Sequence, residues 1–98
     1  MEVIIEKIRL DNNQIIHAKP INRSYDMIYR SAMGVHWDEK ERCLFHTDPK
    51  EWSVLRWYKQ IVLAVKNEYG DTLDVCPSTI FEDIDFDTKE SIKSRDFT

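Results

Sequence analysis

The chain has few of the residues that mark the common classes of small functional protein. Its 98 residues include two cysteines, Cys43 and Cys76, and two glycines, Gly34 and Gly70. Both glycines stand where a helix is expected to end, which excludes the glycine-rich loops that bind phosphate in nucleotide enzymes. Two cysteines in a chain without a secretory signal favour buried thiols over a disulfide.

Long apolar runs and basic clusters are also missing. No apolar run approaches the roughly 18 residues of a membrane span, and the first residues are acidic where a signal peptide would be basic. The net charge is −4, and the fourteen Lys and Arg residues are scattered along the chain. We therefore expect a cytoplasmic protein that has neither a membrane nor a nucleic acid as its partner.

The composition is that of one folded domain. Hydrophobic residues make up 42% of the chain and charged residues 33%, and 98 residues suffice for one core but not for two. We expect a single α+β domain over residues 1–87 and a polar C-terminal tail over residues 88–98.

Periodicity and turn residues predict the elements of this domain. Strands are expected over residues 2–10, 14–19, 35–37, 43–45, 72–76 and 79–86, the first four as two antiparallel hairpins. Helical spacing predicts a short helix over 24–33 that Gly34 ends. It also predicts a long helix from Asp48 to Tyr69, with Gly70 as its left-handed cap. The predicted fold is thus antiparallel β-hairpins with one short and one long helix packed on the sheet.

The long helix has a wide apolar arc at 100° per residue, which is expected to cover the sheet. The arc consists of Val54, Leu55, Trp57, Tyr58, Ile61, Val62, Ala64, Val65 and Tyr69. Trp52 and Leu63 lie instead in the middle of the opposite, polar arc. Helical phase therefore places neither of them in the core.

Two interpretations of Trp52 and Leu63 are open. In the first, Trp52 folds back under a loop at the helix start and Leu63 is an ordinary exposed apolar residue. In the second, Trp52, Arg56, Lys59 and Leu63 form one stripe that contacts a second copy of the chain. Trp and Arg are enriched at binding hot spots, and such a stripe suits a two-fold contact between helices.

A group of aromatic residues offers a small-molecule pocket as another possibility. Tyr25, Tyr29, Trp37, Trp57 and Tyr58 combine apolar area with polar tips, as ligand pockets require. Plain core packing accounts for the same residues.

Metal-binding and catalytic patterns are weak. His36 and His46 could face each other across the second hairpin in one register, which would supply two ligands of a site that needs at least three. Asp83, Asp85 and Asp87 would share one face of the last strand, where carboxylates could hold a divalent ion or simply solvate an edge. We expect no catalytic residue, no metal site and no cofactor, and we keep a metal-dependent hydrolase as the third hypothesis.

Five segments carry a resemblance to a known group. They are YRSA at 29–32, VHWD at 35–38, PKEW at 49–52, WYKQI at 57–61 and EYG at 68–70. In these segments the chain resembles small proteins encoded on bacterial integron gene cassettes. The resemblance implies a bacterial, cytoplasmic, mobile-element product of α+β type, frequently oligomeric and of unknown function, and it transfers no catalytic residue.

The leading functional hypothesis is a non-enzymatic binding protein that acts as a homo-oligomer. It depends on the position of Trp52 and Leu63 outside the expected core face. A small-molecule binder that uses the aromatic residues is the second hypothesis.

Overall fold

Two β-hairpins form the larger part of a six-stranded sheet. The computed structural model describes residues 1–47 and 51–95. Strand β1 (Glu2–Leu10) pairs antiparallel with β2 (Ile16–Pro20), and β3 (Val35–Asp38) pairs antiparallel with β4 (Cys43–His46). In the first turn the Asp11 carboxylate accepts the backbone N–H of Asn13 and Ile15, at 2.8 and 3.0 Å. Both predicted hairpins are confirmed.

Two further strands pair with β1 in the parallel direction. β5 (Thr72–Asp74) pairs with the start of β1 and β6 (Ile80–Glu82) with its second half, both on the edge away from β2. The strand order is β3-β4-β2-β1-β5, with β6 on β1. The α+β class is confirmed, and the sheet is mixed rather than built of hairpins alone.

The long helix begins later than its sequence pattern predicts. Helix α1 (Val54–Tyr69) has 16 residues, and its N-cap is Ser53, whose hydroxyl accepts the Arg56 N–H at 3.1 Å. Asp48, the predicted cap, lies outside the described residues, but residues 51 and 52 are not helical. The helix is therefore about 24 Å long rather than about 30 Å. Gly70 ends it at φ 75°, as predicted.

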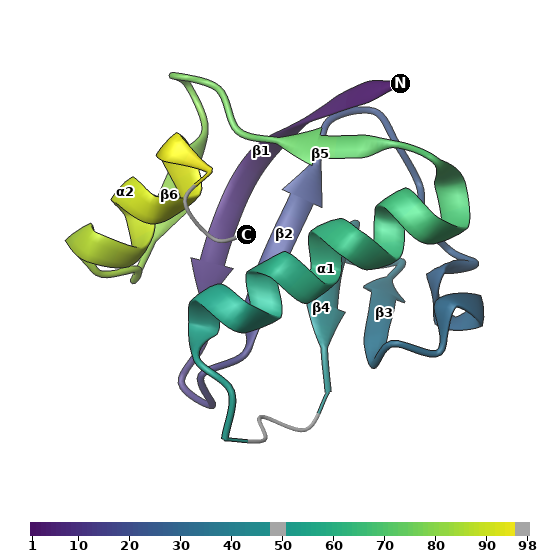
Figure 1. Cartoon of the computed structure of the whole chain (residues 1–98), viewed down its shortest axis with the longest axis horizontal. Helices are drawn as coiled ribbons and strands as arrows, with labels where there is room; N and C mark the ends of the chain where they lie inside the picture. The colour runs from purple at the N-terminus through teal and green to yellow at the C-terminus, as the bar shows by residue number, and fades with distance from the viewer. Residues whose placement is uncertain (48–50, 96–98) are drawn as a thin grey trace.

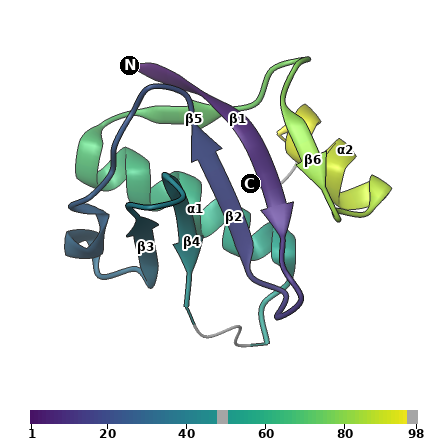
Figure 2. The ribbon, with the colours of Figure 1, turned by 180° about the vertical axis from the view of Figure 1, so that it is seen from behind.

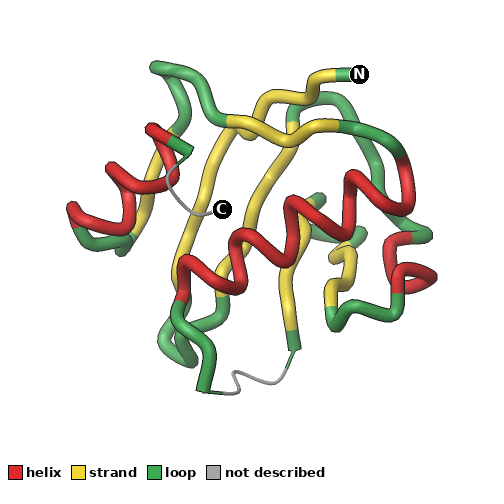
Figure 3. Tube along the Cα trace, viewed as in Figure 1, coloured by secondary structure: helices red, strands yellow, loops and turns green. Residues whose placement is uncertain are grey.

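Helix α1 crosses one face of the sheet (Figures 1 and 3). The main core lies between the helix and this face. The predicted apolar arc is confirmed, because its central residues are all buried: Trp57, Tyr58, Ile61, Val62, Ala64 and Val65. They meet inward side chains of the strands, among them Ile5, Ile8, Ile16 and Leu44. Seen from behind, β1 and β2 face the viewer and α1 lies beyond them (Figure 2). The sheet therefore has one covered face and one open face.

The predicted short helix is a single 3-10 turn, η1 (Ile28–Ser31). Ala32 leaves the helical region at φ 56°, two residues before Gly34. Tyr25 and Ile28 are both fully buried. The Ile28 N–H donates to the Tyr25 carbonyl at 3.0 Å, so the chain turns between these two buried residues just before η1.

The predicted last strand is divided between a strand and a helix. β6 ends at Glu82, Asp83 turns the chain at φ 58°, and α2 (Phe86–Ser94) follows. Asp85 caps this helix by accepting the Thr88 backbone N–H and hydroxyl, at 3.2 and 2.6 Å. The segment expected to be a polar tail thus contains most of α2, and its Ile92 is fully buried in the core.

Asp71 connects two segments that are distant in the sequence. Its carboxylate accepts Arg23 Nε at 2.8 Å and the Tyr25 hydroxyl at 3.0 Å. Asp71 is 3% exposed, and burial raises the pKa of Tyr25, so the phenol stays a donor. The Tyr25 ring also meets Tyr69 edge to face at 4.8 Å. The buried carboxylate therefore fixes the segment before η1 against the end of α1.

We predict that Asp71→Asn lowers the free energy of unfolding by about 2 kcal/mol, because one acceptor is lost in a buried network. The melting temperature should fall by roughly 8–16 °C. Asp74→Asn is the matched control, since the Asp74–Arg95 pair at 3.1 Å is partly exposed and should cost less than about 1 kcal/mol. Equal losses in the two variants, measured by urea denaturation, would contradict the structural role of Asp71.

His46 is fully buried on β4 beneath α1. Its Nε2 accepts the Ile16 N–H at 3.1 Å, and its ring lies parallel to the Trp57 ring at 4.2 Å. Burial lowers the pKa of His46 to about 4, against 6.5 for the free side chain. The neutral imidazole is therefore the form that the fold requires.

We predict that the fold loses stability as pH falls from about 6.5 to about 4. In this window the unfolded chain binds a proton at position 46 and the folded chain does not, so each pH unit costs up to about 1.4 kcal/mol. Urea denaturation at a series of pH values measures this slope. His46→Gln should flatten it, whereas His36→Gln, which changes an outward-facing histidine, should leave it unchanged. A slope that His46→Gln does not alter would show that other groups cause the acid sensitivity.

Candidate interaction surface

Trp52 packs across the start of α1. It is the residue before the Ser53 cap, and its ring meets Trp57 at a centroid distance of 4.6 Å. An apolar residue at this position that contacts the fourth helical residue forms a hydrophobic staple, which fixes how the chain enters the helix. Trp52 is partly buried against the core. Of the two interpretations, the contact supports the one in which this tryptophan folds back at the helix start.

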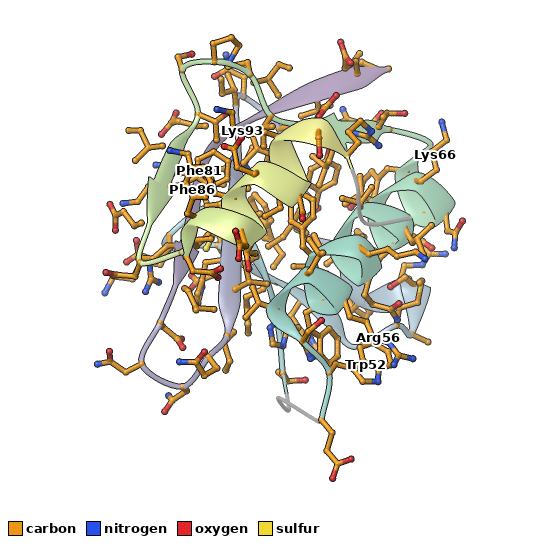
Figure 4. The ribbon with its side chains drawn as sticks, turned by 60° about the vertical axis from the view of Figure 1, so that its left-hand side comes forward. Trp52, Arg56, Lys66, Phe81, Phe86 and Lys93 are labelled. Atoms are coloured by element: carbon orange, nitrogen blue, oxygen red, sulfur yellow. The ribbon has the colours of Figure 1, made fainter. Side chains whose placement is uncertain are left out.

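Arg56 lies over the ring of Trp52. Its guanidinium lies 4.2 Å from the centre of the Trp52 ring, a cation–π distance. Together with the His46–Trp57 pair, this makes a continuous stack from β4 to the molecular surface. Figure 4 shows Trp52 and Arg56 side by side at the N-terminal end of α1, with Lys66 toward its other end. At the surface, this group of rings therefore ends in the Trp52 indole with the Arg56 guanidinium over it.

The four residues of the predicted stripe lie around one shallow depression of about 490 Å³. Its lining consists of Trp52, Ser53, Leu55, Arg56, Lys59, Gln60 and Leu63. Leu63 is 40% exposed. The structure thus brings together Trp52, Arg56, Lys59 and Leu63, which we call the α1 surface.

The α1 surface carries positive charge that the described part of the chain does not neutralise. Neither Arg56 nor Lys59 makes an ion pair with a described residue. The position of the Gln60 side chain is fixed, because its amide donates a hydrogen bond to the Met33 carbonyl at 3.1 Å. The surface therefore combines one exposed leucine with two cations on a rigid helix.

We predict that Trp52→Ala lowers the free energy of unfolding by about 1–2 kcal/mol, because it removes the staple from Trp57. Trp52→Phe should lose only about half as much stability as Trp52→Ala, since a smaller ring still covers Trp57. Leu63→Ala on the same helix is the control and should change stability by less than about 0.5 kcal/mol. Denaturant unfolding at low protein concentration measures all three. If Trp52→Ala is as stable as Leu63→Ala, the staple contributes nothing.

The five aromatic residues predicted to line a ligand pocket do not share one open surface. Tyr25, Trp57 and Tyr58 are buried in the core, at 0, 4 and 1% exposure, whereas Tyr29 is 57% exposed. Trp37 meets Tyr25 edge to face at 6.0 Å and is half-buried. The buried members pack in the core, as the alternative interpretation of these residues expects.

The histidines and aspartates do not gather as the metal hypotheses require. His36 pairs with Phe45 and His46 with Val35, so the two histidines point to opposite faces of the sheet. Asp83 is in a turn, and Asp85 caps α2 instead of sharing a strand face with Asp87. Within residues 1–47 and 51–95, no group of three or more potential ligand side chains could hold a metal ion. The aspartate cluster of the hydrolase hypothesis is thereby corrected.

The open face of the sheet contains a second depression that the sequence patterns did not indicate. It is lined by Lys7, Arg9, His17, Lys19, Glu41 and Cys43. Burial raises the pKa of the Cys43 thiol to about 11, and both cysteines are free. Strand alternation places residues 7 and 9 on one face, but their approach to residues 17, 19 and 43 depends on strand pairings that the sequence leaves open.

Comparison with known proteins identifies one group. Residues 3–79 match the family model described as integron cassette protein Hfx_Cass5. A solved structure, the integron cassette protein Hfx_Cass5 from the mobile metagenome of the North West Arm sewage outfall, is 30% identical. The match covers 96% of this chain and 94% of that chain, with a TM-score of 0.49. A search of curated proteins found no match. Among the described residues, no helix is both long and apolar enough to cross a membrane.

Proposed function

The chain belongs to the Hfx_Cass5 family of integron cassette proteins, and we propose that it is a non-enzymatic interaction protein that forms a homo-oligomer through the α1 surface. One observation carries the proposal. Leu63 is 40% exposed at the centre of the outward face of α1, beside Arg56 and Lys59, which have no ion pair among the described residues. An exposed apolar residue ringed by polar side chains on a rigid helix is a typical centre of a protein contact.

A two-fold contact centred on Leu63 also avoids repulsion between like charges. In such a contact two copies of α1 run antiparallel, and residues face each other when their numbers add to twice 63. Lys59 then faces Asn67 of the second copy, and Lys66 faces Gln60. Arg56 approaches Gly70 at the C-terminal end of the second helix, where the helix dipole is negative. Lys59 and Lys66 therefore face neutral side chains, and Arg56 approaches the negative end of the helix, where Lys66 Nζ also lies at the Gly70 carbonyl.

The size of the surface sets the expected affinity. α1 is about 24 Å long, and a contact along one helix buries less than the ~1,600 Å² of a standard interface. We therefore expect a reversible dimer with a dissociation constant in the micromolar range. Trp52 contributes to this contact together with Arg56, whose guanidinium lies over its ring.

We predict that Leu63→Glu shifts the protein to a folded monomer. The substitution buries two carboxylates against each other at the two-fold axis, where an unpaired charge is costly. In the monomer the new carboxylate lies one helical turn from Lys59 and Lys66, so α1 itself should remain stable. Sedimentation velocity measures the mass, and circular dichroism checks the fold.

Ile80→Glu is the matched control, because Ile80 is an exposed apolar residue of β6, at 54%, outside the α1 surface. The control should remain a dimer despite the same change of net charge. A wild-type protein that stays monomeric at roughly 100 µM, well above a micromolar dissociation constant, would refute the proposal. So would a Leu63→Glu variant with undiminished self-association.

A further inference from the structure

The open face of the sheet gathers cations that are scattered in the sequence. β1 directs Lys7 and Arg9 outward, while Ile8 between them is fully buried. The pairing of β1 with β2 sets Lys7 opposite Lys19 and Arg9 opposite His17. Side chains directly opposite each other on one face of a sheet lie within contact range. Two strands thus place three cations and an imidazole on one small area.

These residues surround a depression of about 90 Å³, completed by Glu41 and Cys43. Among these residues Lys7, Arg9 and Lys19 are cations and Glu41 is an anion. Carboxylates beside the depression pair with two of the three cations, Lys7 and Lys19. The remaining lining cation, Arg9, is therefore the group that can attract an anion.

The ion pairs around the depression leave Arg9 available for a ligand. Lys7 pairs with Glu82 at 2.6 Å, and Lys19 pairs with Glu6 at 3.6 Å. Arg9 is partly buried and makes no ion pair with a described residue. A guanidinium offers several N–H donors in a planar fork that matches the oxygens of phosphate and carboxylate groups.

His17 is held rigidly at the same place. Its Nε2–H donates to the Asp11 carboxylate at 2.9 Å, and its Nδ1 accepts the Cys43 thiol at 3.8 Å. Its ring is stacked on Phe45 at 5.9 Å, and Phe45 in turn meets His36 at 5.7 Å. A row of three flat rings therefore leads away from the depression across β2, β4 and β3.

We propose that this depression binds the phosphate group of a small phosphorylated molecule, whose remaining part lies over Phe45 and His36. The volume of about 90 Å³ corresponds to roughly three water molecules, enough for a phosphate group but too small for a whole metabolite. Arg9 is the principal anion ligand, and the ammonium groups of Lys7 and Lys19, each paired with a glutamate, offer further N–H donors at the edge of the depression. The flat rings provide an apolar surface on which an aromatic or other planar portion can stack.

Titration of the full chain with inorganic phosphate tests the anion site, with chloride at matched ionic strength as reference. Backbone amide NMR signals of Arg9, His17, Lys19 and Cys43 should shift together with phosphate, with a dissociation constant of about 1 mM. Arg9→Gln should weaken binding about tenfold. Lys66→Gln removes one positive charge from α1, outside the depression, and should leave the phosphate affinity unchanged. Equal shifts with phosphate and chloride, or equal losses in the two variants, would overturn the proposal.

Phenyl phosphate tests the stacking surface. It should bind about tenfold more tightly than inorganic phosphate, because its ring covers Phe45, and Phe45→Leu should remove this advantage without abolishing phosphate binding. Benzoate, which has the ring but a carboxylate in place of the phosphate, should bind more weakly than phenyl phosphate. Benzoate binding as tight as that of phenyl phosphate would overturn the assignment to phosphate. An unchanged advantage in Phe45→Leu would overturn the stacking surface. Neither result depends on the oligomeric state.

Discussion

The stack of His46, Trp57, Trp52 and Arg56 connects the sheet, helix α1 and the molecular surface. It runs from β4 through the first turn of α1 to the surface, with centroid distances of 4.2 and 4.6 Å between its rings. The stack determines where α1 begins, because Trp52 can cover Trp57 only if the chain turns into the helix at Ser53. It also requires a neutral His46, whose Nε2 is occupied by the Ile16 N–H. Helix position, sheet contact and protonation state therefore depend on one another.

A single long helix over a six-stranded sheet leaves one face of that sheet uncovered. Asp71 secures the segment before η1 beside the end of α1, and Ile92 of α2 closes the core near β6, so the buried side is complete. The open side is covered by its own side chains instead. Lys7, Lys19 and Arg9 spread over the strands, and Phe45 lies in a row with the imidazole rings of His17 and His36. The open face is thus polar enough for solvent yet retains an aromatic centre.

Sequence patterns correctly predicted the features of the fold that depend on interactions between residues close together in the chain. Both hairpins, the apolar arc of α1 and its end at Gly70 follow from alternation, helical spacing and the conformational freedom of glycine. The role of Trp52 escaped this reasoning because a residue before the cap does not follow the 100° rotation of the helix. The capping signal of Asp85 and Thr88 was present, but the alternation of residues 79–86 concealed it. Strand partners are non-local, so the parallel pairing of β5 and β6 and the cluster around Arg9 required the structure.

The α1 surface and the depression around Arg9 lie on opposite sides of the molecule, since α1 covers the sheet face that is turned away from Arg9 (Figures 1 and 2). A dimer formed through the outward face of α1 would therefore leave both open sheet faces exposed, directed away from each other. Contact along α1 and a ligand on the sheet would not compete for any side chain. The two surfaces are nevertheless linked mechanically, because β4 contributes His46 to the stack on one face and Cys43 and Phe45 to the other. A ligand that fixes Phe45 on the open face would restrict the strand that supports Trp57, and through it the start of α1.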